Sequence, residues 1–157
     1  MTSRLTIEPE VSISSSQRKL PVPAKRSRDL VAFVAARQRV AVEMVDVHVV
    51  GARRMATLNR RFLDHDGPTD VLSFDLGPGP TGGLCGQIVV CSDVAIRQAR
   101  RHGHAPRREL LLYITHGLLH LMGYDDRTDA DARRMHRREN DLLEAFGIGR
   151  VYGAMEK

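Results

Sequence analysis

The sequence contains few aromatic residues and no long apolar run. Aromatic side chains make up 4% of its 157 residues, and tryptophan is absent. The core must therefore rest on aliphatic side chains, and stacking of nucleic-acid bases on aromatic rings is limited as a binding mode. No segment approaches the roughly 20 apolar residues of a membrane-spanning helix, and the N-terminus lacks the apolar core of a signal peptide. We therefore expect a cytoplasmic protein without membrane contact.

Cysteine is also scarce. The two thiols, Cys85 and Cys91, stand six residues apart on either side of the apolar segment GQIVV. This spacing is typical of neither a zinc knuckle nor a redox pair. We expect both to be buried thiols on a strand, as free cysteines usually are.

Positive charge is plentiful and is carried almost wholly by arginine. The sequence has 24 Lys and Arg residues against 19 Asp and Glu, a formal net charge of +5, and lysine occurs only at positions 19, 25 and 157. Arginine favours planar, bidentate contact with phosphate, although most charge runs are solvated helix faces. Two runs flank residues 115–126, an arrangement that would suit a polyanion. They comprise Arg97, Arg100, Arg101, Arg107 and Arg108 on one side and Arg127, Arg133, Arg134, Arg137 and Arg138 on the other.

Size and composition predict one globular domain. A chain of this length with 42% hydrophobic and 27% charged residues can bury a single core. The polar start predicts a partly ordered N-terminal segment over residues 1–22, with an edge strand over residues 5–13. The domain itself then spans residues 23–150, and residues 151–157 form a C-terminal tail.

Hydrophobic periodicity predicts strands and helices without regular alternation. In the most apolar helix, Pro106 suits the first helical position and Gly123 suits a left-handed cap at the end. Ser92 or Asp93 is expected to cap the helix before it through a side-chain oxygen. The expected helices cover residues 27–39, 51–63, 92–101 and 106–122, and the expected strands cover residues 40–50, 69–77 and 86–92.

The segment THGLLHLMGYDD, residues 115–126, carries a candidate metal site. His116 and His120 are four residues apart, so both imidazoles project from one face of the helix. Such a pair can simply be two core histidines, but uncharged imidazoles on so apolar a helix are costly without a partner. Gly123 lets the chain fold back and bring Asp125 or Asp126 towards the same ion, completing a catalytic set of two His and one carboxylate.

The residue after the first histidine bears on the reaction. The metalloprotease signature H-E-x-x-H has its Glu base directly after the first His. Gly117 occupies that position here, which disfavours peptide cleavage by the usual base.

HGLLHLMGYDD, residues 116–126, resembles the signature H-G-x-L-H-L-x-G-Y-D-H of the YbeY family, bacterial endoribonucleases and ribosomal-RNA maturation factors. Every fixed position but the last agrees. LNRRFLDHDGPTDVLSFDL at 58–76 is similar to the family's L-N-x-x-Y-R-x-x-D-x-P-T-D-V-L-S-F segment. GQIVVCSDVAIRQA at 86–99 and MHRRENDLLEAFG at 135–147 resemble two further family segments.

The resemblance implies an α+β single domain, a mixed four-stranded sheet with one antiparallel strand packed with about five helices. It also implies one Zn2+ ion held by His116, His120 and Asp126, with Asp126 in place of the family's third His. Because Asp is a harder, anionic ligand, other divalent metals can suit the site. Asp125 either orients a metal ligand or is a loop acid capping the next helix.

One family position outside the signature bears on RNA binding, and three further histidines also need an assignment. Leu63 replaces a family Arg expected to contact phosphate, and Arg60 or Arg61, one turn earlier, are candidate RNA-binding substitutes. His136 is a rival third metal ligand. Otherwise His102, His104 and His136 are expected at the surface, because they stand near arginines in polar sequence.

The resemblance implies a metal-dependent, single-strand-specific endoribonuclease that matures the 3′ end of 16S rRNA and acts in ribosome quality control. Its partners would be single-stranded or ribosomal RNA and the small ribosomal subunit or its proteins. One alternative is a non-catalytic ribosome-assembly or RNA-binding factor with a structural metal. Another is a hydrolase that acts on a small molecule or a peptide at the same site.

Overall fold

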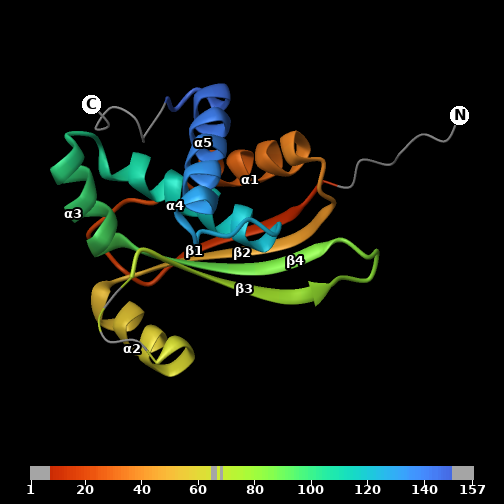
Figure 1. The fold of residues 1–157 in the computed structure, drawn as a ribbon. Helices are drawn as coiled ribbons and strands as arrows, with labels where there is room; N and C mark the ends of the chain where they lie inside the picture. Colours follow the sequence, from red (N-terminus) through yellow and green to blue (C-terminus); the bar gives the residue numbers. More distant parts are fainter. Residues whose placement is uncertain (1–7, 65–66, 68, 150–157) are drawn as a thin grey trace, which may run out of the picture.

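The computed structural model of the protein describes residues 8–64, 67 and 69–149. Strands and helices are mixed along this part of the chain (Figure 1). The strands are β1 (Glu10–Ser15), β2 (Val42–Val50), β3 (Val71–Pro78) and β4 (Leu84–Cys91). The helices are α1 (Ala24–Gln38), α2 (Ala52–Leu63), α3 (Ser92–His102), α4 (Pro106–Leu121) and α5 (Asp129–Phe146).

The four strands form one mixed sheet in the order β1-β2-β4-β3. β1 and β4 both pair with β2 in parallel, and β3 pairs with β4 antiparallel. Helices α1, α4 and α5 lie over one face of the sheet, whereas α2 lies on the opposite side (Figure 1). The predicted α+β domain, with one antiparallel strand and five helices in the described part, is confirmed.

The strand sequences explain which faces are covered. In β2 the valines at 45, 47 and 49 are fully buried, while Asp46 and His48 between them face the polar side of β1. There Ser12 Oγ donates to Asp46 Oδ1 at 2.8 Å, and Ser14 Oγ lies 2.6 Å from His48 Nδ1. Alternation of this kind is expected for a strand with one covered face. The core therefore lies between the sheet and α1, α4 and α5.

α4 is the central helix of this layer, and Gly117 sets how closely it approaches the sheet. A Cβ atom at Gly117 would lie 2.9 Å from Ile88 Cγ2 and 3.0 Å from Ser73 Oγ. The Ser73 hydroxyl also donates to the Gly117 carbonyl at 3.2 Å. Gly117 therefore faces β3 and β4, and any larger residue would push the helix outwards.

The expected elements differ from the observed ones mainly at their ends. α1 begins three residues earlier than expected, at Ala24, and β1 runs over Glu10–Ser15 instead of residues 5–13. Residues 5–7 of that predicted strand, and the predicted tail at 151–157, lie outside the described residues.

Both cysteines are buried and lie on β4, as predicted. No helix in the described part of the chain is long and apolar enough to cross a membrane.

The predicted cap of α3 is wrong. Its N-cap is Cys91, without a side-chain hydrogen bond, and Ser92 Oγ donates to the Val50 carbonyl instead. Asp93 caps a different helix, because its Oδ2 accepts from the Ala52 N–H at 2.6 Å. β2 and β4 end side by side, so the free N–H groups of α2 lie within reach of the first turn of α3.

Candidate metal centre

His116 and His120 lie on the last two turns of α4 and point at each other. Their ring centroids are 4.5 Å apart, and their planes are inclined by 80°. The two Nε2 atoms are 2.9 Å apart. His116 is the more enclosed, with 16% of its side chain exposed against 30% for His120. The pair thus opens towards solvent at one end of a largely buried helix.

The turn after α4 brings Asp126 to the same point. Gly123 adopts φ +99°, and the Tyr124 N–H donates back to the Leu119 carbonyl at 2.9 Å. Asp126 Oδ2 then lies 3.5 Å from the Nε2 atom of each histidine. A left-handed residue after the helix C-terminus commonly produces this reversal, and glycine adopts it without strain.

Asp125 shapes the turn that presents Asp126. Its Oδ1 accepts from the backbone N–H of Asp126 at 2.7 Å and of Arg127 at 3.1 Å. The helix that follows is capped by Thr128, whose side chain accepts from the Asp131 N–H. The hydrogen bonds that Asp125 makes within the described residues are therefore to the backbone of its own turn. Thr128, and not Asp125, is the N-cap of α5.

The spacing of the three atoms suits a small divalent cation. Tetrahedral zinc with bonds of about 2.0–2.2 Å holds neighbouring donor atoms roughly 3.3 Å apart. The separations here are 2.9, 3.5 and 3.5 Å. Three protein donors leave a fourth position for water or substrate, as in catalytic zinc sites. The residues present therefore fit the metal that the sequence predicts.

The far sides of both imidazoles are held by hydrogen-bond acceptors. His116 Nδ1 donates to Glu139 Oε1 at 2.5 Å, and His120 Nδ1 donates to the Tyr124 carbonyl at 3.0 Å. With the protons on Nδ1, both Nε2 lone pairs face Asp126 Oδ2. Metal-ligating histidines are usually oriented in this way. Without a cation, only a shared proton between the two Nε2 atoms, or between one of them and Asp126, would relieve the convergence of these three acceptor atoms.

Glu139, on α5, was not identified from the sequence. Its side chain is fully buried, and its Oε2 atom has no hydrogen-bond partner among the described residues. A signal was available: Met135, Glu139 and Leu142 are spaced as one face of a helix, and both neighbours are buried core residues. A carboxylate on such an apolar face requires a partner, and His116 supplies it.

Glu139 also changes the acidity of His116. Burial lowers the pKa of His116, but the hydrogen bond and the negative charge of Glu139 outweigh burial, and the pKa is raised overall. The same carboxylate that orients the ring thus makes its Nε2 atom a stronger base and a stronger electron donor.

The remaining histidines only partly match the sequence prediction. His104 is not a surface residue, because only 12% of its side chain is exposed, and it packs with His102 near the buried Glu109. His136 is half-buried on α5, and the atoms that converge with His116 and His120 in the described structure come from Asp126. The polar sequence around His104 was misleading because the α3–α4 connection folds inwards.

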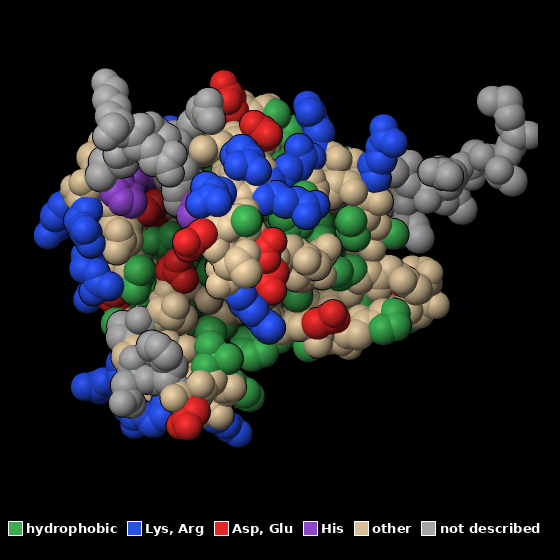
Figure 2. All heavy atoms as spheres, in the orientation of Figure 1, with side chains coloured by type: hydrophobic (Ala, Val, Ile, Leu, Met, Phe, Trp, Pro, Cys, Tyr) green, Lys and Arg blue, Asp and Glu red, His purple; other side chains and the backbone are tan. Residues whose placement is uncertain are grey.

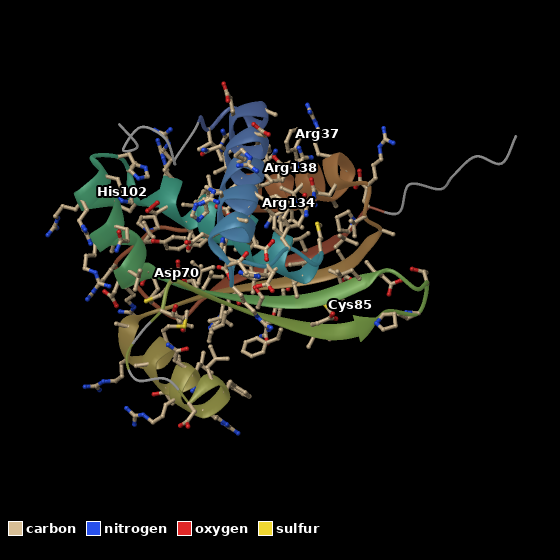
Figure 3. All side chains as sticks on the ribbon, viewed as in Figure 1. Arg37, Asp70, Cys85, His102, Arg134 and Arg138 are labelled. Carbon is tan, nitrogen blue, oxygen red and sulfur yellow. The ribbon has the colours of Figure 1, made fainter. Side chains whose placement is uncertain are left out.

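Arginine side chains gather beside the site, on α5. The Arg134 guanidinium lies 5.4 Å from the centre of the Tyr124 ring. Arg138 Nε donates to Gln38 Oε1 at 2.5 Å, and Gln38 Nε2 donates to the Tyr124 hydroxyl at 3.3 Å. Figure 2 shows basic side chains over α5 and α1, and Figure 3 labels Arg134 and Arg138 there. We call Arg134 and Arg138 the Tyr124 arginine cluster.

The cations predicted to bind RNA lie elsewhere. Arg60 and Arg61 are exposed on the last turn of α2, on the opposite side of the sheet from α4 and α5 (Figure 1). Leu63, which ends the same helix, is 59% exposed.

Comparisons with known proteins find relatives that share most of this chain. A family model described as Endoribonuclease YbeY matches residues 12–147. An Endoribonuclease YbeY of Anaeromyxobacter sp. (strain Fw109-5) is 43% identical over 140 residues, which cover 88% of this chain and 72% of that protein. Another of Thermobifida fusca (strain YX) is 37% identical over 141 residues, covering 84% and 91%. A solution structure of a Thermotoga maritima protein matches with a TM-score of 0.59 at 27% identity, covering 87% of this chain and 88% of that one.

Proposed function

This chain belongs to the Endoribonuclease YbeY family, and on that basis we propose that it hydrolyses single-stranded RNA with a divalent metal ion held by His116, His120 and Asp126. As a family member the chain is an endoribonuclease that acts in ribosomal RNA maturation. The metal ion, its three ligands and the preference for single-stranded RNA are the parts of this activity that we propose.

One observation carries the metal assignment. The Nε2 atoms of His116 and His120 and a carboxylate oxygen of Asp126 converge within 3.5 Å of one another, while both Nδ1 atoms are bonded to acceptors on their far sides. Two imidazoles favour zinc and other transition metals over Mg2+ or Ca2+. Zn2+ is therefore our first choice, and the anionic Asp126 also suits harder divalent ions.

The residues of the chain have distinct roles in this scheme. Glu139 fixes the His116 ring and keeps its proton on Nδ1, and the Tyr124 carbonyl does the same for His120. Asp126, with 42% of its side chain exposed, borders the solvent side from which substrate would enter. A divalent ion bound there supplies Lewis acidity, which makes water a better nucleophile at neutral pH and polarises a phosphoryl oxygen.

Arginines would hold the RNA backbone. The Tyr124 arginine cluster stands next to the turn that carries Asp126, and Arg60 and Arg61 add a second proposed contact on α2. With few aromatic residues, recognition relies on charge and shape, so RNA binding falls steeply with salt.

We further propose that the protein acts in the cytoplasm, that its substrate is the 3′ end of 16S rRNA, and that it takes part in ribosome quality control. Its proposed partners are the small ribosomal subunit or the proteins of that subunit.

Substitution of His116 tests the proposal. H116A should lose the ion of this site and should lose cleavage of a single-stranded ribosomal-RNA precursor, because one of three ligands is gone. H48A removes a histidine on β2 that bonds to Ser14, and it should keep both properties. Cleavage that persists in H116A would contradict the metal mechanism.

The same preparations separate the rival functions. A wild-type protein that binds RNA and metal but does not cut RNA would support the assembly factor with a structural metal. Cleavage of a peptide substrate would support the hydrolase alternative, which the structure disfavours because Gly117 faces the sheet and leaves no room for a Glu base there.

A further inference from the structure

A second group of metal-binding side chains lies where α3 meets α4. His102 ends α3, His104 lies in the connection, and Glu109 belongs to the first turn of α4. His102 Nδ1 is 3.3 Å from Glu109 Oε1, and His104 Nε2 is 3.6 Å from Glu109 Oε2. One donor atom from each residue lies within 4.8 Å of the others. Figure 3 shows His102 at this corner, away from the labelled arginines Arg134 and Arg138.

Two members of the group have buried polar atoms without hydrogen-bond partners among the described residues. Glu109 is 1% exposed, and its Oε2 atom has no partner among the described residues. Both ring nitrogens of His104 are buried and lack a hydrogen bond within the same residues. A buried polar group without a hydrogen bond destabilises the fold, and a charged one does so more strongly. Three such atoms at one place require an explanation.

Protonation alone does not give each of these three buried atoms of Glu109 and His104 a hydrogen-bond partner. Burial raises the pKa of Glu109, and burial together with the positive charge of Arg108 lowers the pKa of His104. A protonated Glu109 would spare the charge, but one His104 nitrogen would still lack a partner, and His102 and His104 would not share a ligand. A cation would also leave one His104 nitrogen unpaired, but it would bind one donor atom from each of the three residues and would compensate the Glu109 carboxylate in its charged form.

We propose that His102, His104 and Glu109 form a second site for a divalent transition-metal ion, separate from the His116–His120–Asp126 group. Two imidazoles and one carboxylate suit Zn2+ or a similar ion and disfavour Mg2+ and Ca2+. Glu109 precedes His116 by seven residues, so it lies on the same face of α4, about 10 Å away along the helix axis. The ion would tie the end of α3 to the first turn of the helix that carries His116 and His120.

Zinc titration of the metal-free, full-length chain tests this site. The wild-type chain should bind about two equivalents, and E109Q and H116A should each bind about one. The double variant E109Q/H116A should bind none, and H48A should match the wild type. H102A provides an independent variant, because the His102 side chain is 29% exposed and its loss should not disturb the core. Unchanged zinc binding in both E109Q and H102A would overturn the proposal.

Thermal stability supplies a readout that does not depend on cleavage. In H116A, which keeps only the second site, saturating Zn2+ should raise the melting temperature by about 5 °C or more. The rise should disappear in E109Q/H116A, and its persistence there would contradict the site. Loss of one equivalent in E109Q with no loss in H116A would support the second site while refuting the proposed catalytic one.

Discussion

Glu139 Oε1 lies 2.5 Å from His116 Nδ1, so a fully buried carboxylate on α5 fixes a ring on α4. This contact joins residues 23 positions apart in the sequence and makes the closing helix part of the candidate metal centre. The position of His116 therefore depends on how α5 packs against α4, as well as on the helix to which it belongs.

Replacing Glu139 should weaken metal binding without removing a ligand. E139Q keeps the size of the side chain but removes the charge that strengthens His116 as a donor, so zinc affinity should fall about 10- to 100-fold. Competition with a chromophoric chelator measures the affinity, and RNA cleavage at limiting zinc should fall with it. E144Q changes an exposed glutamate on the same helix and should leave zinc affinity unchanged. Equal affinities in E139Q and the wild type would refute a supporting role for Glu139.

Substitutions of Asp126 test the third ligand. D126A should lower zinc affinity by at least about tenfold, because one of three protein ligands is lost, whereas D126H should retain binding through an imidazole nitrogen. Elemental analysis after dialysis against a weak chelator distinguishes the two variants. D141N, at an exposed position of α5, is the control. If D126A retained metal as firmly as the wild type, another residue, such as His136, would have to be the third ligand.

Sequence patterns predicted the parts of the site that are local along the chain. The four-residue spacing of the histidines and the bend at Gly123 depend on helix geometry and on the conformational freedom of glycine, so both can be read from neighbouring residues. Together they bring Asp125 or Asp126 towards His116 and His120, and the choice of Asp126 came from the resemblance to the family signature. The strands also follow from local patterns, because their alternating or continuous apolar residues reflect one or two covered faces.

Contacts between distant segments could not be read in this way. Glu139 falls on an apolar helix face and Glu109 precedes a run of leucines, so their burial could be suspected, but their partners depend on which helix faces meet in the folded chain. His104 was assigned to the surface for the same reason. Asp93 was a candidate cap for its own helix, α3. The ends of β2 and β4 instead place its carboxylate beside the start of α2. Tertiary packing decided each of these cases.

The Asp93 contact predicts a pH-dependent contribution to stability. The hydrogen bond from Lys19, followed by that from the Ala52 N–H, holds the pKa of Asp93 below its ordinary value of 3.8. A carboxyl whose pKa is lower in the folded state stabilises the fold fully above its unfolded pKa, and this contribution is lost as pH falls through the folded pKa. D93N should therefore lower the free energy of unfolding by about 1 kcal/mol at neutral pH, because both Lys19 and the N-terminus of α2 favour a charged carboxylate.

The corresponding loss in melting temperature should be about 2–4 °C, and the difference from wild type should shrink as the pH falls below 3.8. D29N, which breaks the exposed pair of Asp29 with Lys25, is the control and should cost less than about 0.5 kcal/mol. A D93N defect of the same size at all pH values would argue against a carboxylate cap.

Arg134 and the pair Arg60–Arg61 lie on opposite sides of the sheet, so they should act on different lengths of RNA. R134A removes a cation beside Tyr124 and should weaken binding of both short and long single-stranded RNA, with the salt slope reduced by about 0.7 for one lost phosphate contact. R60A/R61A should weaken binding only of RNA long enough to reach α2. Fluorescence anisotropy over a range of salt concentrations measures both effects. K25A removes a cation already paired with Asp29 and should change neither. If R134A bound both RNAs with the wild-type affinity and salt slope, the RNA backbone would have to cross the protein away from Tyr124.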